Sequence, residues 1–455
     1  MLKKRIYTLI EIKDRELLGK TLFSINLADA GYSAVIGKKN NLYHYSNYFK
    51  SGIFFFKGMG PNNYKDMIKL KKLGHKIVGY DEEGLVMNQV ETISKRVDSR
   101  CMKLVEFFFT VGKNQSKNTL KAYPEFNYKI KEIGNSRFDL LKKRMKNFFI
   151  GETDKIKKKY GKFVFFPSKF TILNNQLYPG IPKDVKEGPG RRVLESDLAD
   201  QIKIETKLKK FFNYFPKKYP NIKIVVKPHP IENKNYWINL IKKINCKNFI
   251  LADDKYLTNS YIISSEFNVG SNCHTSLESY LANKPTINLR PSNKDGFIIS
   301  KLIRAISTVE ILDIKKLEKI IKDWFINKKK FKIKLTKKQK KILNYNIKNV
   351  KKNADYYFLK NIKKIVIKPK IKEDKYSNFF FLYFLENLRR LKNKYYNFIS
   401  FKKRRDYQKL KFSGLDQKEF DNNIYKICKS LKKNYYNYKI KEIYPGCYCI
   451  EKKVE

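Results

Sequence analysis

The chain has 455 residues, of which 99 are Lys or Arg and 43 are Asp or Glu, so its formal net charge is +56. With 42% hydrophobic residues it can bury the cores of two or three domains, which excludes wholesale disorder. Six irregularly spaced cysteines exclude a small disulfide scaffold and favour a reducing cytoplasm. Lys, Asn, Ile, Tyr and Phe are all abundant, as in proteins of AT-rich genomes, so the charge alone indicates only attraction to anionic partners.

The sequence contains no stretch of the roughly 18 to 20 apolar residues that a membrane-spanning helix needs. The apolar run after the basic N-terminus is interrupted by Glu11, Lys13 and Asp14, which argues against a signal peptide. We therefore expect a cytoplasmic protein that is soluble or peripheral on the inner face of the membrane.

The first 155 residues alternate between predicted strands and helices. Strands are predicted at 5–10, 32–36 and 75–79, and helices at 16–30 and 64–73. This βαβ rhythm is typical of a parallel sheet, so we expect residues 1–155 to form a Rossmann-like domain.

A second alternating block predicts another Rossmann-like domain at 156–310. Its predicted strands are 162–167, 221–226, 248–251, 261–263 and 286–289, and its predicted helices are 194–214 and 276–282. After residue 310, Lys, Asn and Tyr dominate and the apolar positions have helical spacing. We therefore predict an α/β protein with two Rossmann-like domains and a basic, mostly helical extension at 311–455.

An acidic turn follows the predicted strand 75–79. Asp81, Glu82, Glu83 and Gly84 would lie at the carboxyl end of a parallel strand, where α/β proteins bind ligands. Neighbouring carboxylates raise one another's pKa, which suits one of them to accept a proton, and Gly84 would allow a sharp turn. The structural alternative is a solvated turn that caps a helix.

The second candidate site follows the predicted strand 221–226. Lys227, Pro228, His229 and Pro230 form a KPHP motif, in which the two prolines restrict the backbone around the histidine. A fixed imidazole, helped by Lys227, could donate to a phosphate oxygen. The alternative is a turn histidine that caps a strand.

The third candidate site is a run of small polar residues at 270–278. Its candidate ligand contacts are Asn272, His274, Thr275, Ser276 and Glu278. Hydroxyls and backbone N–H groups at a helix N-terminus can bind phosphate. The alternative is ordinary capping, with Glu278 completing a capping box. Metal ligation by Cys273 and His274 is not expected, because no second pair stands at ligand spacing.

Taken together, the three motifs resemble a known family. The order of an acidic turn with Gly, then His-Pro, then a helix start rich in Ser and Thr is similar to GT-B-type glycosyltransferases that use CMP-activated Kdo or sialic acid. The closest resemblance is to the bacterial surface carbohydrate biosynthesis proteins, at GHKIVGYDEEGLV, KPHP and NCHTSLESYLANKPTIN among other segments between residues 5 and 295.

The resemblance implies roles for individual residues. Glu83 matches the catalytic carboxylate, with Glu82 and Asp81 as rivals, and His229 matches the histidine that supports the CMP phosphate. The other implied substrate contacts are Lys227, Pro230, Thr275, Ser276 and Glu278, with Glu11 and Arg15 on the acceptor side. His274 departs from the family pattern, which usually has Thr or Ser there.

The implied reaction transfers a nonulosonic sugar from its CMP ester to a lipopolysaccharide or surface polysaccharide acceptor, with no metal and no separate cofactor. The carboxylate would be a general base if the configuration inverts and a nucleophile if it is retained. Two alternatives remain open: a CDP-glycerol or CDP-ribitol phosphotransferase of the teichoic-acid type, and a basic non-enzymatic protein that binds nucleic acid or anionic membrane. Under the transferase hypothesis no nucleic-acid partner is expected.

Overall fold

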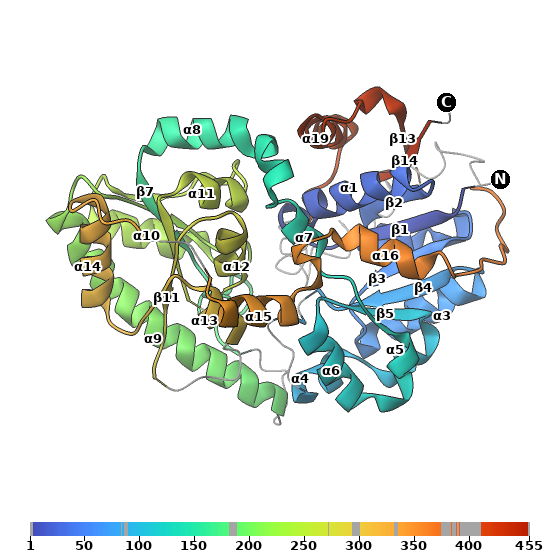
Figure 1. Ribbon diagram of the computed structural model, residues 1–455, viewed down its shortest axis with the longest axis horizontal. Helices are drawn as coiled ribbons and strands as arrows, with labels where there is room; N and C mark the ends of the chain where they lie inside the picture. The colour runs from blue at the N-terminus through green and yellow to red at the C-terminus, as the bar shows by residue number, and fades with distance from the viewer. Residues whose placement is uncertain are drawn as a thin grey trace. The chain divides into compact units, whose positions relative to one another are not determined.

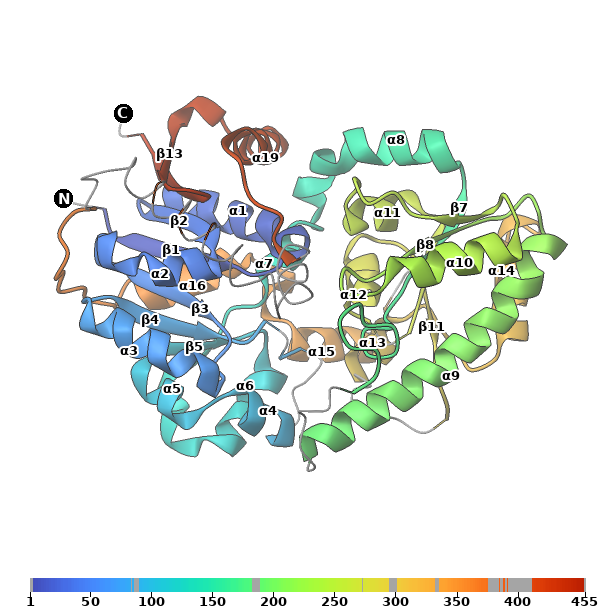
Figure 2. The same ribbon diagram turned by 180° about the vertical axis from the view of Figure 1, so that it is seen from behind.

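The chain folds into two compact units (Figures 1 and 2). Unit 1 comprises Met1–Leu140 and Asn344–Glu455, and unit 2 comprises Leu141–Leu343. The computed structural model describes residues 3–82, 84, 85, 90–181, 189–271, 273–293, 301–331, 335–374, 384, 388, 391 and 411–453. These limits differ from the predicted boundaries at 155 and 310, because the chain beyond Asn344 returns to the unit that contains its N-terminus.

Unit 1 is built on an eight-stranded sheet with the order β13-β14-β2-β1-β3-β4-β5-β6. Its strands are β1 (Arg5–Ile10), β2 (Ser33–Lys38), β3 (Ile53–Lys57), β4 (Lys76–Tyr80), β5 (Phe107–Thr110), β6 (Ile130–Glu132), β13 (Tyr438–Tyr444) and β14 (Cys447–Lys452). From β2 to β6 every pair of neighbours is parallel. This confirms the Rossmann-like sheet that the βαβ rhythm predicts.

Strand β3 shows how helices cover both faces of this sheet. Successive side chains of a strand point to opposite faces, so Phe54 and Phe56 share one face and Phe55 takes the other. On the Phe55 side, Phe358 of α16 (Ala354–Ile362) lies 4.9 Å from the Phe55 ring, measured between ring centroids. Phe23 of α1 (Lys13–Asp29) packs against both rings.

The opposite face is covered by shorter helices from the first half of unit 1. Leu42 of α2 (Lys39–His44), Met67 of α3 (Tyr64–Lys72) and Met102 of α5 (Ser99–Leu104) belong to the same buried cluster as Phe54 and Phe56. The remaining α-helices that the structure describes in this unit are α4 (Val90–Arg96), α6 (Lys113–Ala122), α7 (Ser136–Asp139) and α19 (Gln417–Ser430).

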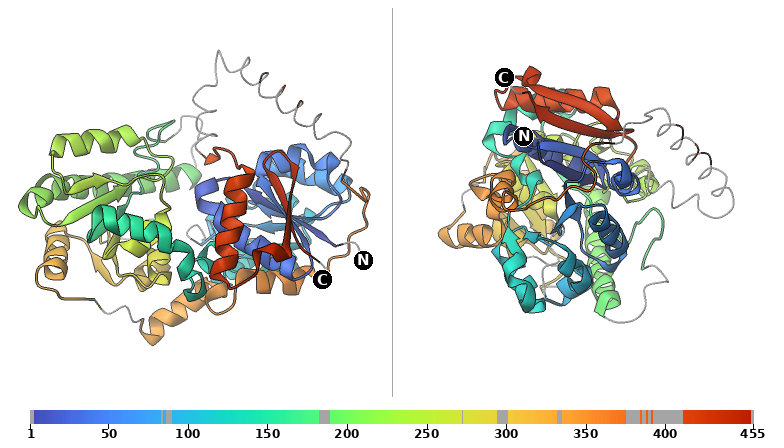
Figure 3. Two further views of the ribbon diagram at one scale, coloured as in Figure 1. Left: turned by 90° about the horizontal axis from the view of Figure 1, so that it is seen from above. Right: turned by 90° about the vertical axis from the view of Figure 1, so that its right-hand side faces the viewer.

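A C-terminal hairpin extends this sheet, in a region where the sequence predicts helices. Strands β13 and β14 pair antiparallel, and β14 pairs antiparallel with β2, so that Cys449 lies opposite Val35. Figure 3 shows the hairpin (red) bordering the N-terminal strands (blue). The hairpin could not be recognised from the sequence, because apolar residues in the neighbouring segments have helical spacing. The apolar partners of an edge hairpin come from strands that are distant in the sequence.

Within unit 1, the buried amide of Asn349 joins the segment before α16 to the N-terminal part of the chain. Asn349 accepts a hydrogen bond from the backbone N–H of Asn135 (3.0 Å) and donates to the Asn135 carbonyl (2.8 Å) and to Asp139 (2.9 Å). Gly134 allows this approach, because its φ is +89° and a Cβ there would lie 2.1 Å from the Asn349 amide oxygen. The contact fixes the wall of a pocket described below.

Unit 2 has a six-stranded parallel sheet with the order β12-β11-β10-β7-β8-β9. Its strands are β7 (Phe163–Pro167), β8 (Lys223–Lys227), β9 (Phe249–Leu251), β10 (Phe267–Gly270), β11 (Thr286–Leu289) and β12 (Val309–Ile311). Its helices are α8 (Ile150–Tyr160), α9 (Pro189–Lys218), α10 (Lys234–Ile244), α11 (Thr258–Ser264), α12 (His274–Leu281), α13 (Lys301–Ile306) and α14 (Ile314–Phe325), and α15 (Lys337–Asn346) spans the unit boundary. The second predicted Rossmann-like sheet is therefore confirmed.

The strand predicted at 261–263 is wrong, because these residues lie in α11. An apolar run of three residues is too short to show a period, so the sequence could not separate a strand from a buried helical turn. In the fold, Tyr261 stacks on Phe165 of β7 with ring centroids 5.5 Å apart. Helix α11 thus covers one face of the sheet rather than joining it.

In the described part of the chain, no helix is both long and apolar enough to cross a membrane.

Candidate functional site

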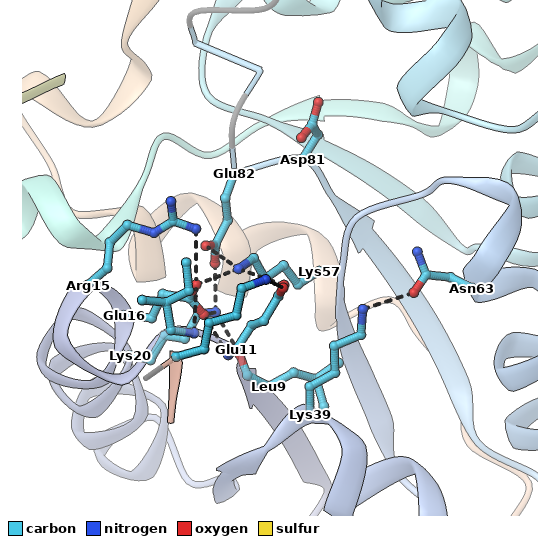
Figure 4. A network of polar contacts seen from close by, with 12 residues as sticks. Leu9, Glu11, Arg15, Glu16, Lys20, Lys39, Lys57, Asn63, Asp81 and Glu82 are labelled. Carbon is cyan, nitrogen blue, oxygen red and sulfur yellow. Dashed lines mark hydrogen bonds and ion pairs between the residues drawn. The ribbon is translucent and has the colours of Figure 1, made fainter. Parts of the chain in front are cut away.

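The first part of the site lies where three neighbouring strands of unit 1 end. Glu11 follows β1, Lys57 is the last residue of β3, and Glu82 follows β4. Because β1, β3 and β4 are parallel neighbours, their carboxyl ends meet at one edge of the sheet. Figure 4 shows the three side chains pointing toward one another.

Glu16 of α1 is the buried centre of this network, with no exposed surface. Its carboxylate accepts hydrogen bonds from the backbone N–H groups of Glu11 (3.0 Å) and Ile12 (3.3 Å) and forms ion pairs with Lys57 and, at 3.0 Å, with Lys20. Burial alone would raise the pKa of Glu16, but these cations hold it well below its usual range. Glu16 is therefore ionised at neutral pH and is occupied by structural contacts.

Glu82 enters the same network from the other side. One of its oxygens lies 2.7 Å from Lys20 and the other 3.8 Å from Lys57, while its Oε2 accepts no hydrogen bond in the described structure. Although burial opposes a charge on Lys57, Glu82 and Glu16 raise the pKa of its ammonium group. The network thus offers one buried carboxylate oxygen that can still accept a hydrogen bond.

Glu11 and Arg15, the predicted acceptor-side residues, are both part of this network. Glu11 lies 3.1 Å from Lys57 and 3.1 Å from Lys411, and Arg15 lies 3.3 Å from Glu16. Burial opposes the charge of Glu11, but the two lysines outweigh it and lower its pKa to about 2. Lys411 comes from the C-terminal segment, which therefore contributes a charge to the network.

Asp81 has a different role from Glu82. Its buried carboxylate is bound by the guanidinium of Arg96, with N–O distances of 2.5 and 3.1 Å, and Figure 4 shows it outside the network. The Asp81 carbonyl accepts from Gln115 (3.5 Å) and from the N–H of Gly84 (3.2 Å). Asp81 therefore holds the acidic turn in shape. Glu83 lies outside the described residues.

Gly84 is required by close packing. A Cβ at this position would lie 1.7 Å from the amide nitrogen of Gln115. Gln115 is itself buried and accepts a hydrogen bond from the Val111 N–H at 2.7 Å. No side chain therefore fits at position 84 unless Gln115 moves.

In unit 2 the KPHP motif follows β8, as predicted. Lys227 donates to the Tyr256 carbonyl (3.1 Å) and lies 3.9 Å from Asp254. The Nδ1 atom of His229 accepts from the Ile231 N–H (3.4 Å), which assigns the proton of the neutral ring to Nε2. The imidazole is therefore held as an Nε2–H donor, and Pro230 is exposed beside it.

Glu232 organises this loop, and the sequence analysis did not single it out. It is buried, and it accepts from the Ser168 hydroxyl (2.7 Å), the Phe170 N–H (2.8 Å), the Trp237 indole N–H (3.0 Å) and the His229 N–H (3.3 Å). Burial raises the pKa of Glu232, although these donors oppose the shift. In the sequence, Glu232 could have been identified as an acidic residue three positions after His229.

The third motif begins helix α12 at the carboxyl end of β10. A Cβ at Gly270 would lie 3.1 Å from the Ser276 hydroxyl and 4.0 Å from that of Thr275, so both hydroxyls face the end of the strand. Neither oxygen has a hydrogen-bond partner in the described structure, and both oxygens are buried. Buried hydroxyls beside a helix N-terminus can donate to an anion.

The remaining residues of this motif differ in exposure. His274 is half-buried, whereas Glu278 is only 3% exposed, so its carboxylate lies inside unit 2. Asn272 lies outside the described residues. No group of three or more metal-binding side chains occurs among the residues that the structure describes.

A small cavity lies at the start of the third motif. It has a volume of about 50 Å³, and its lining includes Pro167 and Gly270, the last residues of β7 and β10, and the serines Ser168 and Ser271 that follow them. Ligand pockets usually measure about 300 to 1,000 Å³, so this cavity alone does not hold a nucleotide. The cavity lies at the carboxyl edge of the unit 2 sheet, between the loops that follow its strands.

No protein-family model matches the sequence, and no curated protein matches it. Solved structures with a similar fold include UDP-GlcNAc 2-epimerase from Neisseria meningitidis bound to UDP-GlcNAc, with a TM-score of 0.49, 12% identity, and 80% of this chain and 100% of that chain covered. The S. aureus MnaA–UDP structure has a TM-score of 0.43 and 11% identity, with 80% and 99% covered. At such scores the likeness carries no argument about activity.

Proposed function

We propose that the protein is a glycosyltransferase that moves a nonulosonic sugar from a CMP ester to a surface polysaccharide or lipopolysaccharide. The observation that carries this proposal is the pair of buried hydroxyls, on Thr275 and Ser276, that face Gly270 and have no hydrogen-bond partner among the residues that the structure describes. A bound phosphate would supply the acceptors that these hydroxyls lack.

The donor chemistry requires stabilisation of a leaving phosphate. When the bond between the sugar's anomeric carbon and the CMP oxygen breaks, the phosphate gains a second negative charge. The Nε2–H of His229 can donate a hydrogen bond to the phosphate, and the start of α12 can stabilise its charge through the helix dipole. Glu232 acts as a positioning residue, because it holds the backbone of His229.

The acceptor chemistry requires a carboxylate. In an inverting reaction the carboxylate takes the proton of the acceptor hydroxyl as that oxygen bonds to the anomeric carbon, and in a retaining reaction it is the nucleophile. Asp81 is occupied by Arg96, and we assign it to the turn. Glu83 keeps the role that the family resemblance implies, and Glu82 is its rival, because its Oε2 accepts no hydrogen bond from the described residues.

The proposed acceptor is made by a route that involves lipid-linked glycans on the inner face of the membrane. The net charge of +56 suits a protein that works close to such an anionic surface. The proposed transfer does not require a separate cofactor.

A thermal-shift panel with CMP, CDP, UDP, GDP and UDP-GlcNAc tests the nucleotide. A ligand that binds only the native state raises the apparent melting temperature, and we expect CMP alone to do so at equal concentrations. A response to UDP, UDP-GlcNAc or GDP without CMP would contradict the proposal. A response to CDP alone would instead favour a CDP-glycerol or CDP-ribitol phosphotransferase.

Single variants separate the proposed roles. His229→Ala is expected to weaken the CMP-induced shift, whereas Glu83→Gln is expected to abolish transfer and to leave the CMP shift unchanged. Glu82→Gln is the matched comparison for the choice of catalytic carboxylate. If Glu83→Gln retains wild-type transfer, Glu83 is not the base or nucleophile.

A further inference from the structure

Unit 1 contains a pocket that the proposed reaction does not use. Its volume is about 660 Å³, within the range typical of ligand sites. It is bordered by α6, β6 and α16, and both helices are labelled in Figure 1. Six lysines line it: Lys113, Lys117, Lys131, Lys348, Lys352 and Lys360.

The charge of this pocket is strongly one-sided. Glu132 is the only carboxylate among the described residues that line it, and it lies 3.5 Å from Lys348. A concave surface concentrates the field of the charges around it, so six ammonium groups and one carboxylate favour an anionic ligand. Five of these lysines, all except Lys131, are exposed, so their ammonium groups can reorient toward such a ligand.

Two tyrosines give the pocket aromatic surface. The Lys352 ammonium lies 4.0 Å from the centroid of the Tyr356 ring, and the Lys348 ammonium lies 5.2 Å from that of Tyr357. Tyr356 is 46% exposed, so its ring remains available to a ligand. Cations beside exposed aromatic rings suit a ligand that has both anionic groups and rings.

The wall that carries these tyrosines is anchored. Phe358, the next residue of α16, packs on Phe55 and Phe109 with ring centroids 4.9 and 5.2 Å away. Asn349 holds the preceding turn to Asn135 through two hydrogen bonds. The pocket is therefore formed before a ligand arrives, which lowers the entropy cost of binding.

The geometry of the tyrosines favours a saccharide over a nucleic acid. Sites for single-stranded nucleic acid stack successive bases on aromatic side chains along an extended groove. Tyr356 and Tyr357 are adjacent in one helix, and their rings are 85° apart in plane with centroids separated by 5.2 Å. They cannot form parallel platforms for successive bases, whereas a sugar ring can contact one face and one edge.

We propose that this pocket binds a carboxylated oligosaccharide, as the acidic part of the glycan acceptor. The proposal rests on the proposed function for its choice of carboxylate, because nonulosonic sugars carry a carboxylate and a glycan that already contains them is acidic. The lysines pair with the carboxylates, and Tyr356 contacts a sugar ring. No covalent step occurs in this pocket.

The test measures binding of a fluorescent α2,8-linked sialic acid tetramer to the full-length protein by anisotropy, without a donor. We expect the double variant Lys113→Glu/Lys360→Glu to bind about tenfold more weakly, because it reverses one charge on each wall. Tyr356→Ala is expected to bind a few-fold more weakly. The matched control is Lys316→Glu/Lys319→Glu, which reverses two exposed lysines on α14 and is expected to bind as the wild type does.

Three results would overturn the proposal. These are equal binding of neutral maltotetraose, equal loss of affinity in the pocket and α14 variants, and absence of tetramer binding to the wild type. Pocket-dependent binding of octauridylate or of phosphatidylglycerol vesicles, without the tetramer, would assign the pocket to another partner. The CMP thermal shift is measured in parallel: if it is absent while pocket-dependent tetramer binding persists, only the proposed transferase function fails.

Discussion

The Lys20 ammonium on α1 lies 2.7 Å from a carboxylate oxygen of Glu82 in the turn after β4, and neither side chain is more than 8% exposed. Lys20 also lies 3.0 Å from Glu16 and donates to the Leu9 carbonyl at 2.6 Å. One ammonium thus joins the helix, the end of β1 and the acidic turn. The candidate site depends on this connection for its shape.

Lys20→Met is expected to destabilise the protein by about 3 kcal/mol, because it leaves two buried carboxylates with fewer cationic partners. Denaturant unfolding measures the change. Lys13→Met is the matched control, since Lys13 pairs with Glu419, whose side chain is 36% exposed. This partly exposed pair should contribute less than about 1 kcal/mol, and equal effects of both variants would refute the assigned role of Lys20.

Gly84→Ala is expected to destabilise the acidic turn, because the added Cβ would occupy the place of the Gln115 amide nitrogen. Gln115→Ala also destabilises, since the Val111 N–H then loses its acceptor. The double variant should lose less unfolding free energy than the two single variants lose in sum, because truncating Gln115 makes room for the methyl group. Additive losses in unfolding free energy would show that the two positions do not compete for space.

His75 predicts an acid-sensitive step in stability. It is 1% exposed, its Nδ1 accepts from the Gly52 N–H at 3.1 Å, and burial lowers its pKa to about 4. Since the unfolded histidine has a pKa near 6.5, the stabilising effect of neutral His75 is fully present above that pH and is lost as pH falls toward 4. The slope should approach about 1.4 kcal/mol per pH unit.

The measurement for His75 is the unfolding free energy between pH 7.5 and pH 4.5. His75→Asn is the matched variant, because its side-chain oxygen can accept from Gly52 but does not titrate in this range. The unfolding free energy of the variant should change less with pH than that of the wild type across this pH range. Identical pH profiles would mean that other groups cause the acid sensitivity.

Glu232→Gln is expected to destabilise unit 2 by about 1 to 3 kcal/mol, because an amide group would turn a donor toward the N–H groups that the carboxylate now accepts from. The buried indole of Trp237 reports the change by fluorescence during urea unfolding. Glu195→Gln is the control, since this side chain is 48% exposed and forms an i,i+4 ion pair with Arg191 on its own helix. Its effect should stay below about 0.5 kcal/mol.

Much of the fold could be predicted because strand and helix periods are local. The run at 75–79 and the motif after 221–226 were placed correctly, since apolar strands followed by polar turns are read from adjacent residues. The sequence did not predict the edge hairpin β13–β14 or helix α11. Their secondary structure depends on a neighbouring strand or sheet face that is distant in the sequence.

The sequence by itself determined that two parallel α/β sheets form and that an acidic turn, a KPHP motif and a Ser/Thr helix start follow their strands. Only the tertiary structure decided which carboxylates remain available, because Arg96, Lys20 and Lys57 reach Asp81, Glu82 and Glu16 from other elements. It also placed residues 344–455 in unit 1 with the N-terminal 140 residues, where lysines of α16 and of the turn before it line a pocket with α6. Ion pairs and pockets depend on distances in space, and residue spacing along the chain does not specify those distances.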